Sequence, residues 1–393
     1  MLAPLNELLK EPIASVVDRQ QHTLERLLSE HHNRVVLFGA GTLGKRAIAL
    51  FRGIGVEPLA VTDNSKSVWG GSCEGCPILS PEDAARRFGA DAIFLITVWN
   101  DHHWYRDTFA MLTAYGCRSV SSYAPIFWRF PDTFLTLLLL NELPVNLFQD
   151  AHHVQLADDL WADELSTQIY RANIHWRALG DASHLPGPPA ENTYFPADIF
   201  SLSDHEVLLD CGAFNGDTIR QVLQRRGSGF DEIHSIEADA VSFQNLKQEV
   251  CGMAPDVQSK IHLKQCAVGS ERTTVRFASS GSLTSKICDT AEDGVEVECF
   301  PIDDLFSNAP ITMIKMDIEG AEYGALMGAR NTIQRDKPLL AICVYHTQSD
   351  IWRIPLLIHE LLPEHKLYLR AYEGDGFQTV TFAVPPHRVL NAQ

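Results

Sequence analysis

The stretch Leu208-Leu-Asp-Cys-Gly-Ala-Phe-Asn-Gly-Asp-Thr218 decides the fold of the second half of the chain. Its apolar start ends at Asp210 and is followed by Gly212 and Gly216, residues that let a backbone turn sharply and approach a ligand closely. The pattern predicts a short buried strand, a glycine turn and then a helix. Many nucleotide-binding folds begin in this way, so the stretch predicts a binding loop without identifying its ligand.

Strands and helices keep alternating after this loop. Further parallel strands are expected at 233–236, 261–268, 311–316 and 339–344. Helices are expected at 218–225, 241–250, 321–329 and 351–362. Antiparallel strands are expected at 274–277, 295–299, 366–372 and 379–384. Because a turn-rich Glu373-Gly-Asp-Gly376 joins the last two, they predict a hairpin that closes five parallel strand–helix units, the topology expected of a class I methyltransferase sheet.

Acidic residues stand at the ends of three expected strands. Asp210, Glu237 and Asp317 should therefore meet at the sheet edge where open α/β sheets bind their ligands. Glu237 lies 21 residues after Gly216, about where an acid accepts both hydroxyls of a ribose, but it does not separate an adenosine ligand from a dinucleotide. Asp210 and Asp317 suit the sulfonium and ammonium of S-adenosylmethionine and would repel a pyrophosphate. The alternative is that these two acids only cap loops.

The segment from Leu208 to Thr379 resembles the FkbM family of S-adenosylmethionine-dependent methyltransferases. Besides the opening stretch, the resembling pieces are Ile236-Glu-Ala-Asp239, Gln265-Cys-Ala-Val268, Ile314-Lys-Met-Asp-Ile-Glu-Gly-Ala-Glu322 and Val344-Tyr-His346. Their shared order along the chain is more specific than any one piece. The resemblance covers about half of the chain and says nothing directly about residues 1–200. It implies O-methylation of hydroxyls on natural products and sugars.

Carried over position by position, the resemblance implies a cofactor site built on the glycine loop. Asp210 and Gly212 would hold the methionine part of S-adenosylmethionine, and Glu237 would take the ribose. Cys266 and Ala267 would border the adenine, and Asp317 would sit at the methyl-transfer end. The expected cofactor-binding residues are Asp210, Gly212, Ala213, Gly216, Thr218, Glu237, Ala238, Cys266, Ala267 and Asp317.

Catalysis needs one more group, because a protonated alcohol is a poor nucleophile in an in-line displacement. His346, at the end of the fifth strand, is the candidate base because imidazole titrates near neutrality; the alternative is a histidine that orients a loop. Asp317, Glu319 and His346 are the candidate catalytic residues and also the candidate ligands of a divalent metal ion. The sequence leaves the distances between these three ligands undefined, so a metal-free site is the alternative.

A second glycine loop, Gly39-Ala-Gly41-Thr-Leu-Gly44, follows an expected strand at 35–38 and opens a helix. Asp63 lies 19 residues after Gly44, at the end of the next strand, which meets the context of a dinucleotide fingerprint. The module is short and lacks a second mononucleotide half. Two interpretations stay open: a second nucleotide site formed by these three glycines and Asp63, or a nucleotide fold used for assembly or acceptor binding.

These patterns divide the chain into three parts. Residues 1–125 are expected to form an N-terminal helix and a small Rossmann-like domain, and residues 126–200 a helical connector and loop. Residues 201–393 are expected to form a class I methyltransferase domain. The predicted fold class is therefore α/β, with two Rossmann-like domains of which the C-terminal one is closed by an antiparallel hairpin.

Composition limits the partners. The 393 residues are 45% hydrophobic and carry a formal net charge of -18, so neither nucleic acid nor an anionic membrane is expected, and a small-molecule or carbohydrate acceptor fits better. Residues 1–10 lack a signal peptide, and nine irregularly spaced cysteines favour reduced thiols, so a cytoplasmic location is expected. The apolar run at 137–140 could pack between domains or between subunits of a homo-oligomer.

Three functions compete at this stage. The first is a methyltransferase that acts on a hydroxyl of a small molecule, sugar or glycan precursor. The second is an NAD-dependent oxidoreductase centred on Gly39–Gly44. The sequence argues against it, because no Tyr-x-x-x-Lys pair follows that loop. The third is a non-catalytic nucleotide-sensing protein. Calorimetry with S-adenosylhomocysteine and NAD separates them.

Overall fold

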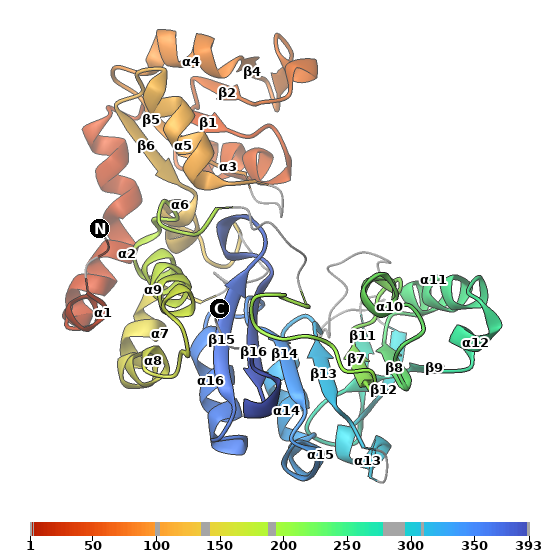
Figure 1. The fold of residues 1–393 in the computed structure, drawn as a ribbon. Coiled ribbons are helices and arrows are strands. Elements are labelled where there is room, and N and C mark those ends of the chain that lie inside the picture. The colour runs from red at the N-terminus through yellow and green to blue at the C-terminus, as the bar shows by residue number, and fades with distance from the viewer. Residues whose placement is uncertain are drawn as a thin grey trace. The chain divides into compact units, whose positions relative to one another are not determined.

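The computed structural model describes residue 2 and residues 4–98, 103–134, 142–187, 194–277, 295–307 and 310–390. The chain divides into two compact units, each built on a large sheet of its own (Figure 1). The N-terminal unit comprises Met1–Asp158, Gln168–Pro189 and Ala371–Phe377. The C-terminal unit comprises Asp159–Thr167, Ala190–Arg370 and Gln378–Gln393. The predicted boundaries at 125 and 200 stay predictions.

The N-terminal unit contains a six-stranded sheet in the order β3-β4-β2-β1-β5-β6. Its strands are β1 (Val35–Phe38), β2 (Ala60–Thr62), β3 (Ser72–Cys73), β4 (Cys76–Leu79), β5 (Ile93–Ile96) and β6 (Ser119–Ser122). All neighbouring pairs are parallel except the short hairpin of β3 and β4. Every residue of β1 and β5 is buried, as expected for central strands of a parallel sheet.

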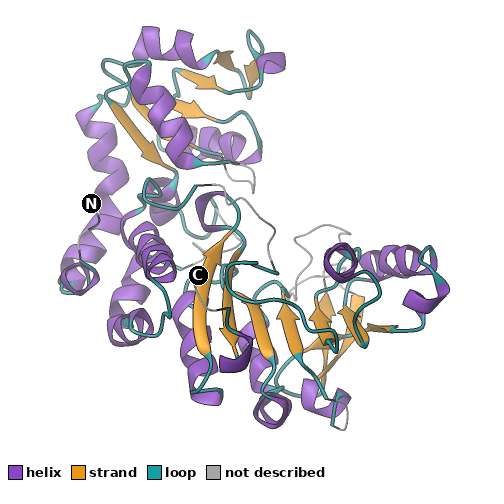
Figure 2. Ribbon diagram, in the orientation of Figure 1, coloured by secondary structure: helices purple, strands orange, loops and turns teal. Residues whose placement is uncertain are grey.

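Helices alternate with these strands (Figure 2). The helices up to residue 179 are α1 (Leu5–Leu8), α2 (Ile13–Glu30), α3 (Thr42–Gly53), the 3-10 turn η1 (Lys66–Val68), α4 (Pro81–Phe88), α5 (Tyr105–Ala114), α6 (Ala124–Arg129), α7 (Pro144–Gln149), α8 (Ala151–Asp158) and α9 (Glu164–Leu179). Amphipathic α2 buries Val16, Leu24 and Leu28 and packs against α6 and α7. The predicted α/β character of this region is confirmed.

The C-terminal unit contains a seven-stranded sheet in the order β15-β16-β14-β13-β7-β8-β9. Its strands are β7 (Val207–Cys211), β8 (Glu232–Glu237), β9 (Ile261–Gln265), β13 (Met313–Met316), β14 (Leu339–Cys343), β15 (Lys366–Ala371) and β16 (Thr379–Val384). The strands β7, β8, β9, β13 and β14 run parallel, and β16 is antiparallel to β14. The predicted topology of parallel strands closed by a hairpin is confirmed.

This strand order determines where a ligand can bind. The chain winds from β7 to β8 and β9 on one side, and it later adds β13 and β14 on the other side. The carboxyl ends of β8, β7 and β13 therefore lie next to one another at a topological switch point, where open α/β sheets bind ligands. Asp210, Glu237 and Asp317 stand at or just after these ends.

A smaller sheet in the order β10-β12-β11 completes the unit. Its strands are β10 (Ala267–Val268), β11 (Thr273–Phe277) and β12 (Val295–Phe300). The two antiparallel strands predicted at 274–277 and 295–299 are present as β11 and β12, which pair with each other. The single strand predicted at 261–268 is wrong, because β9 ends at Gln265 and β10 pairs with β12 instead. Ala267, Val297 and Cys299 form a small core of their own, which draws the chain away from the large sheet.

The remaining helices are α10 (Asp217–Arg226), α11 (Ala240–Cys251), α12 (Pro255–Gln258), α13 (Ile302–Leu305), α14 (Glu322–Met327), α15 (Arg330–Asp336), α16 (Asp350–Leu361) and the 3-10 turns η2 (Gly374–Gly376) and η3 (Pro386–Arg388). The helix predicted at 321–329 is shorter because it stops at Gly328, where a Cβ atom would lie 2.0 Å from the carbonyl oxygen of Gly269. Within the described ranges, no helix combines the length and apolar character needed to cross a membrane.

Candidate functional site

The glycine loop between β7 and α10 has a backbone that most residues rarely adopt. Gly212 and Gly216 have φ values of 79° and 83°, and Phe214 between them has a φ of 44°. A Cβ atom on Gly212 would lie 1.9 Å from the carbonyl oxygen of Asp317. The predicted sharp turn is therefore present, and Gly212 is needed because the loop after β13 approaches it closely.

Glu237, at the end of β8, is bound to this loop. Its carboxylate accepts a hydrogen bond from Phe214 N at 2.7 Å on one oxygen and from Asp239 N at 2.7 Å on the other. Glu237 is buried, and burial raises its pKa although both amides oppose the rise. The two amides fix the orientation of the carboxylate, and each oxygen keeps a lone pair for a ligand hydroxyl.

Asp210 and Lys315 form a buried ion pair on adjacent central strands. Lys315 Nζ lies 3.0 Å from Asp210 Oδ1 and donates a hydrogen bond to the Gly212 carbonyl oxygen at 2.7 Å. Burial raises the pKa of Asp210 to about 6, and Lys315 opposes that rise. Burial disfavours the charge of Lys315, but Asp210, Asp317 and Asp217 together raise its pKa. Lys315 therefore stays charged and links the end of β7 to the glycine loop.

Asp317, directly after β13, is contacted by three polar side chains. Tyr194 donates its hydroxyl to Oδ2 at 2.6 Å, and Tyr345 donates its hydroxyl to Oδ1 at 3.3 Å. His346 Nε2 lies 3.2 Å from the same Oδ1. Burial disfavours the carboxylate, but His346, Lys315 and Tyr194 outweigh burial and lower the pKa of Asp317. Asp317 is therefore ionised at neutral pH.

His346, the candidate base, is enclosed by carboxylates. Its Nε2 lies 3.8 Å from Glu319 Oε2 as well as close to Asp317, and its Nδ1 lies 2.9 Å from Glu322 Oε1. Burial disfavours the imidazolium, but Glu322 and Asp317 raise the pKa of His346 well above its usual range. A protonated imidazole has two N–H donors and no lone pair for another proton. The base role stays a prediction, and it requires the neutral form that these neighbours disfavour.

Glu322 is a member of this cluster that the sequence did not reveal as a site residue. It lies in the first turn of α14 and accepts hydrogen bonds from Ile318 N at 2.7 Å and Gly320 N at 3.0 Å. Its side chain is fully buried beside His346. Glu322 therefore holds the loop that carries Asp317 and also orients the imidazole.

Ligand atoms of Asp317, Glu322 and His346 lie within 4.8 Å of one another and could hold a metal ion. The predicted ligand set was Asp317, Glu319 and His346. Glu319 comes near His346, but the converging group contains Glu322 in its place. Both oxygens of Glu322 already accept backbone N–H groups, which reduces their capacity for an ion. A metal at this position stays an alternative.

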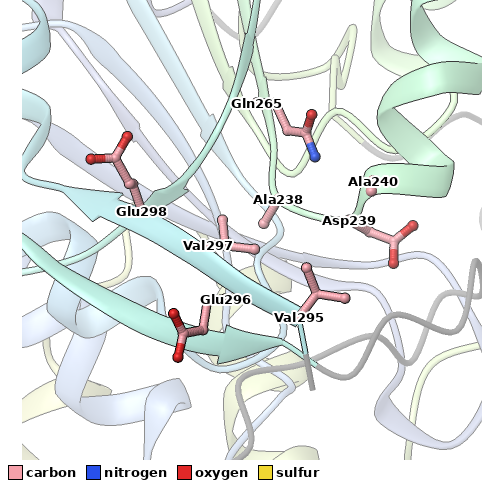
Figure 3. Close-up of a pocket in the computed structure, with 8 residues that line it drawn as sticks. All are labelled: Ala238, Asp239, Ala240, Gln265, Val295, Glu296, Val297 and Glu298. Carbon is pink, nitrogen blue, oxygen red and sulfur yellow. The ribbon is translucent and has the colours of Figure 1, made fainter. Parts of the chain in front are cut away.

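A hollow of about 190 Å³ opens beside the end of β8 (Figure 3). The lining residues come from the segment after Glu237, the end of β9 and β12: Ala238, Asp239, Ala240, Gln265, Val295, Glu296, Val297 and Glu298. In Figure 3, Ala238 and Val297 lie near each other, between Gln265 and Glu296. The lining includes Gln265 and the predicted Ala238, whereas the predicted Cys266 and Ala267 are buried and follow Gln265 in the chain.

Two further predicted cofactor residues support the loop from within. Ala213 is fully buried, and its N–H donates to the Ile236 carbonyl at 3.1 Å, next to the bond from Gly212 N at 2.9 Å. Thr218 is fully buried in the first turn of α10. Their contacts are consistent with a structural role beside the ligand, and direct cofactor contact stays a prediction.

The N-terminal glycine loop has a similar hydrogen-bond plan. Asp63 accepts hydrogen bonds from Ala40 N at 2.9 Å and from Ser65 N at 2.8 Å. A Cβ atom on Gly44 would lie 2.0 Å from the Gly39 carbonyl oxygen, so glycine lets α3 pack closely against the loop. A Cβ on Gly41 would meet nothing within 4 Å. The four predicted residues are therefore brought together, and nucleotide binding by them stays a prediction.

Tyr194 is a second residue that the sequence did not reveal. Its ring centroid lies 4.9 Å from Lys315 Nζ, and its hydroxyl bonds Asp317. It therefore covers both central charges of the site. Tyr194 lies in the connection before β7, far along the chain from either partner, and an aromatic residue after a Pro-rich stretch carries no recognisable signal.

Residues 210–373 match the family model described as the methyltransferase FkbM domain. The solved structure of methyltransferase FkbM from Methylobacillus flagellatus KT is similar over 96% of this chain and 99% of its own, with 22% identity and a TM-score of 0.73, which establishes a shared fold. Fibrillarin from Aeropyrum pernix, solved with S-adenosyl-L-methionine, is 10% identical over 47% of this chain and 69% of its own, and its TM-score of 0.30 supports no inference. No curated protein matches the sequence significantly.

Proposed function

We propose that this chain, whose residues 210–373 match the methyltransferase FkbM domain, transfers a methyl group from S-adenosylmethionine to a hydroxyl of a small molecule, sugar or glycan precursor. The charge at the strand ends is the observation that carries this proposal. Asp210, Glu237 and Asp317 put three carboxylates beside the glycine loop, with Lys315 buried among them. Such an edge attracts a cationic ligand and repels a pyrophosphate.

The side chains present fit the parts of this cofactor. Asp210 and Asp317 suit its ammonium and sulfonium groups. Glu237 is oriented by two amides and keeps lone pairs for the ribose hydroxyls. The neighbouring hollow offers apolar surface from Val295 and Val297 for the adenine ring.

The cofactor, when bound, supplies an electrophilic methyl group on sulfur. The protein must align the acceptor oxygen with that methyl group and take up the hydroxyl proton. Asp317, Glu319 and His346 are the groups that we assign to this end of the site. Because Asp317 and Glu322 stabilise the imidazolium, a neutral His346 would take up a proton readily. The same contacts keep the neutral form scarce until the pH exceeds the raised pKa of His346, so transfer should quicken as pH rises.

A methyl-transfer assay on the full-length chain tests this proposal. S-adenosylmethionine with a labelled methyl group would be incubated with a panel of sugars, glycan precursors and hydroxylated small molecules. We expect label on an acceptor oxygen, located by mass spectrometry, together with equimolar S-adenosylhomocysteine. Binding of NAD without any binding of S-adenosylhomocysteine would instead favour the oxidoreductase alternative and remove the proposal.

A further inference from the structure

A second group of metal-ligand side chains lies on β8 and β9, outside the strand ends described above. Ligand atoms of Glu232, His234 and His262 lie within 4.8 Å of one another. His234 and His262 are register partners on these parallel strands, and Glu232 stands two residues before His234. Alternate residues of a strand share a face, so all three side chains lie on one face of the sheet. β9 is the last strand on this side.

The distances within this group approach those of a coordination shell. Glu232 Oε2 lies 2.8 Å from His234 Nε2 and 3.7 Å from His262 Nε2. Zinc binds imidazole nitrogen and carboxylate oxygen at about 2.0–2.2 Å, so the ligand atoms of a tetrahedral site lie about 3.4 Å apart. The two observed distances lie on either side of that value, and small side-chain rotations would equalise them.

The two imidazoles are already arranged side by side. Their centroids are 4.8 Å apart with the planes at 24°, and the Phe306 ring meets His234 edge-on at 5.1 Å. The side chain of His234 is 17% exposed, whereas Glu232 and His262 are about half exposed. The rings of His262 and Phe306 therefore hold His234 in place, and Glu232 and His262 remain accessible to an ion from solution.

The lysines two positions before and two positions after His262 have partners of their own. Lys260 Nζ donates to the carbonyl oxygens of Ser228 at 2.9 Å and Phe230 at 2.7 Å. Lys264 Nζ lies 5.1 Å from the centroid of the Phe300 ring. Their ammonium groups are thus directed to other atoms and leave Glu232 to the two histidines.

We propose that Glu232, His234 and His262 bind a zinc ion, with the fourth position open to water. Two imidazoles and one carboxylate are a ligand set that zinc accepts in tetrahedral sites. The site is separate from the strand ends, because His234 and Glu237 stand three positions apart on β8, about 10 Å along the strand. The ion links the edge strand β9 to β8, so it stabilises the folded chain by binding. This inference does not depend on methyl transfer.

Titration of the metal-free, full-length chain with zinc chloride by calorimetry tests the site. Zinc can also bind elsewhere on the chain, so the comparison between variants carries the result. Since loss of an outer-shell partner alone typically costs 10–100-fold in metal affinity, losing a direct ligand in His262→Ala should weaken one zinc-binding event by about 100-fold. Glu232→Gln, another half-exposed position, should have the same effect with little risk to folding.

His205→Ala provides the matched control, because His205 is an exposed histidine of the same unit whose Nδ1 lies 3.3 Å from an Asp231 carboxylate oxygen. We expect this variant to keep the zinc stoichiometry of the unmodified chain. Zinc should also raise the unfolding temperature of the unmodified chain and of His205→Ala more than it raises that of His262→Ala. Unchanged zinc stoichiometry and affinity in His262→Ala and Glu232→Gln would overturn the proposal.

Discussion

The two glycine loops of this chain have the same pattern of hydrogen bonds to an acidic side chain, but they differ in the charged residues around them. Asp63 accepts hydrogen bonds from the amides of Ala40 and Ser65. Glu237 likewise accepts hydrogen bonds from the amides of Phe214 and Asp239. In each case the acid stands at the end of the second strand, Asp63 just after β2 and Glu237 as the last residue of β8, and it supports the loop. An acid at this position is therefore a feature of the fold, whether or not a ribose binds it.

The neighbouring strand ends are where the loops differ. Beside the N-terminal loop the buried polar residues Thr62 and Thr97 are uncharged, and Thr97 donates its hydroxyl to the Phe38 carbonyl oxygen at 3.0 Å. Beside the C-terminal loop stand the buried Asp210–Lys315 pair and Asp317. Burying charge is costly, and perturbed charges cluster at functional sites. The comparison teaches that the two loops differ in their buried charges more than in their glycines, and the charged loop is the one to which we assign the cofactor.

The largest expected effect of this difference is on stability. Lys315→Met leaves Asp210 buried without its partner, so the free energy of unfolding should fall by about 3–5 kcal/mol, measured by chemical denaturation. Thr97→Val in the other unit removes one neutral hydrogen bond and should cost only about 1 kcal/mol. Equal losses in the two variants would contradict the contrast. Adding Asp210→Asn to Lys315→Met should restore part of the loss.

Catalysis gives the next contrast. His346→Ala should lower kcat by about 100-fold, the usual contribution of a general base, while the affinity for S-adenosylhomocysteine stays largely unchanged. An exchange at Asp63 should leave kcat as it is. Activity assays with saturating cofactor measure the kcat of both variants. Full activity of His346→Ala would remove His346 as the base and leave it as a residue that orients the loop.

The pH dependence of His346 tests the same residue independently. Its neighbours raise its pKa above the ordinary value of 6.5, so the neutral base becomes available, and kcat should increase, as pH rises through that raised pKa. Stability has the opposite sign: the pairing of the imidazolium contributes fully below about pH 6.5 and is lost as pH rises through the folded-state pKa. His346→Gln should flatten both profiles. Unaltered profiles in that variant would show that another group titrates.

Cofactor affinity should separate the two acids. Glu237→Ala should weaken S-adenosylhomocysteine binding about tenfold or more, since a hydrogen bond to a charged group contributes about 1.5–3 kcal/mol. Asp63→Ala is the matched variant and should leave that affinity unchanged. Calorimetry on both proteins decides the matter. A loss of affinity from Asp63→Ala alone would assign the cofactor to the other loop.

The smallest effect is expected from a methyl group on each loop. Gly41→Ala has open space around the new Cβ and a negative φ of -81°, so stability should change by less than about 0.5 kcal/mol. Gly216→Ala forces a positive φ of 83° and should cost about 1–3 kcal/mol. Thermal unfolding of the two variants measures the difference. Similar values would mean that the N-terminal loop is held as tightly as the C-terminal one.

Much of the fold could be predicted because it depends on local patterns. Apolar runs between glycine turns and amphipathic helices locate the strands to within a few residues, as at 379–384. The convergence of Asp210, Glu237 and Asp317 also follows, since parallel strands end at one edge. The break between β9 and β10 at Cys266 could not be predicted from the sequence, because it depends on a small core shared with distant Val297.

The details of the site depend on contacts that one sequence does not contain. Tyr194 reaches Asp317 from a connection over a hundred positions away. Glu322, in the first turn of α14, accepts hydrogen bonds from two backbone amides and lies beside His346, and these contacts depend on the folded loop. The charge state of His346 depends on burial between carboxylates, which neither residue type nor spacing reveals.

A crystal structure of the full-length chain grown with S-adenosylhomocysteine tests the central claim most directly. We predict the ligand at the C-terminal glycine loop, with its ribose hydroxyls on Glu237, its amino acid part near Asp210 and its adenine in the hollow beside Ala238. The N-terminal loop at Gly39–Gly44 should hold no such ligand. S-adenosylhomocysteine bound at Gly39–Gly44, or bound at the C-terminal loop without contact to Glu237, would contradict the account.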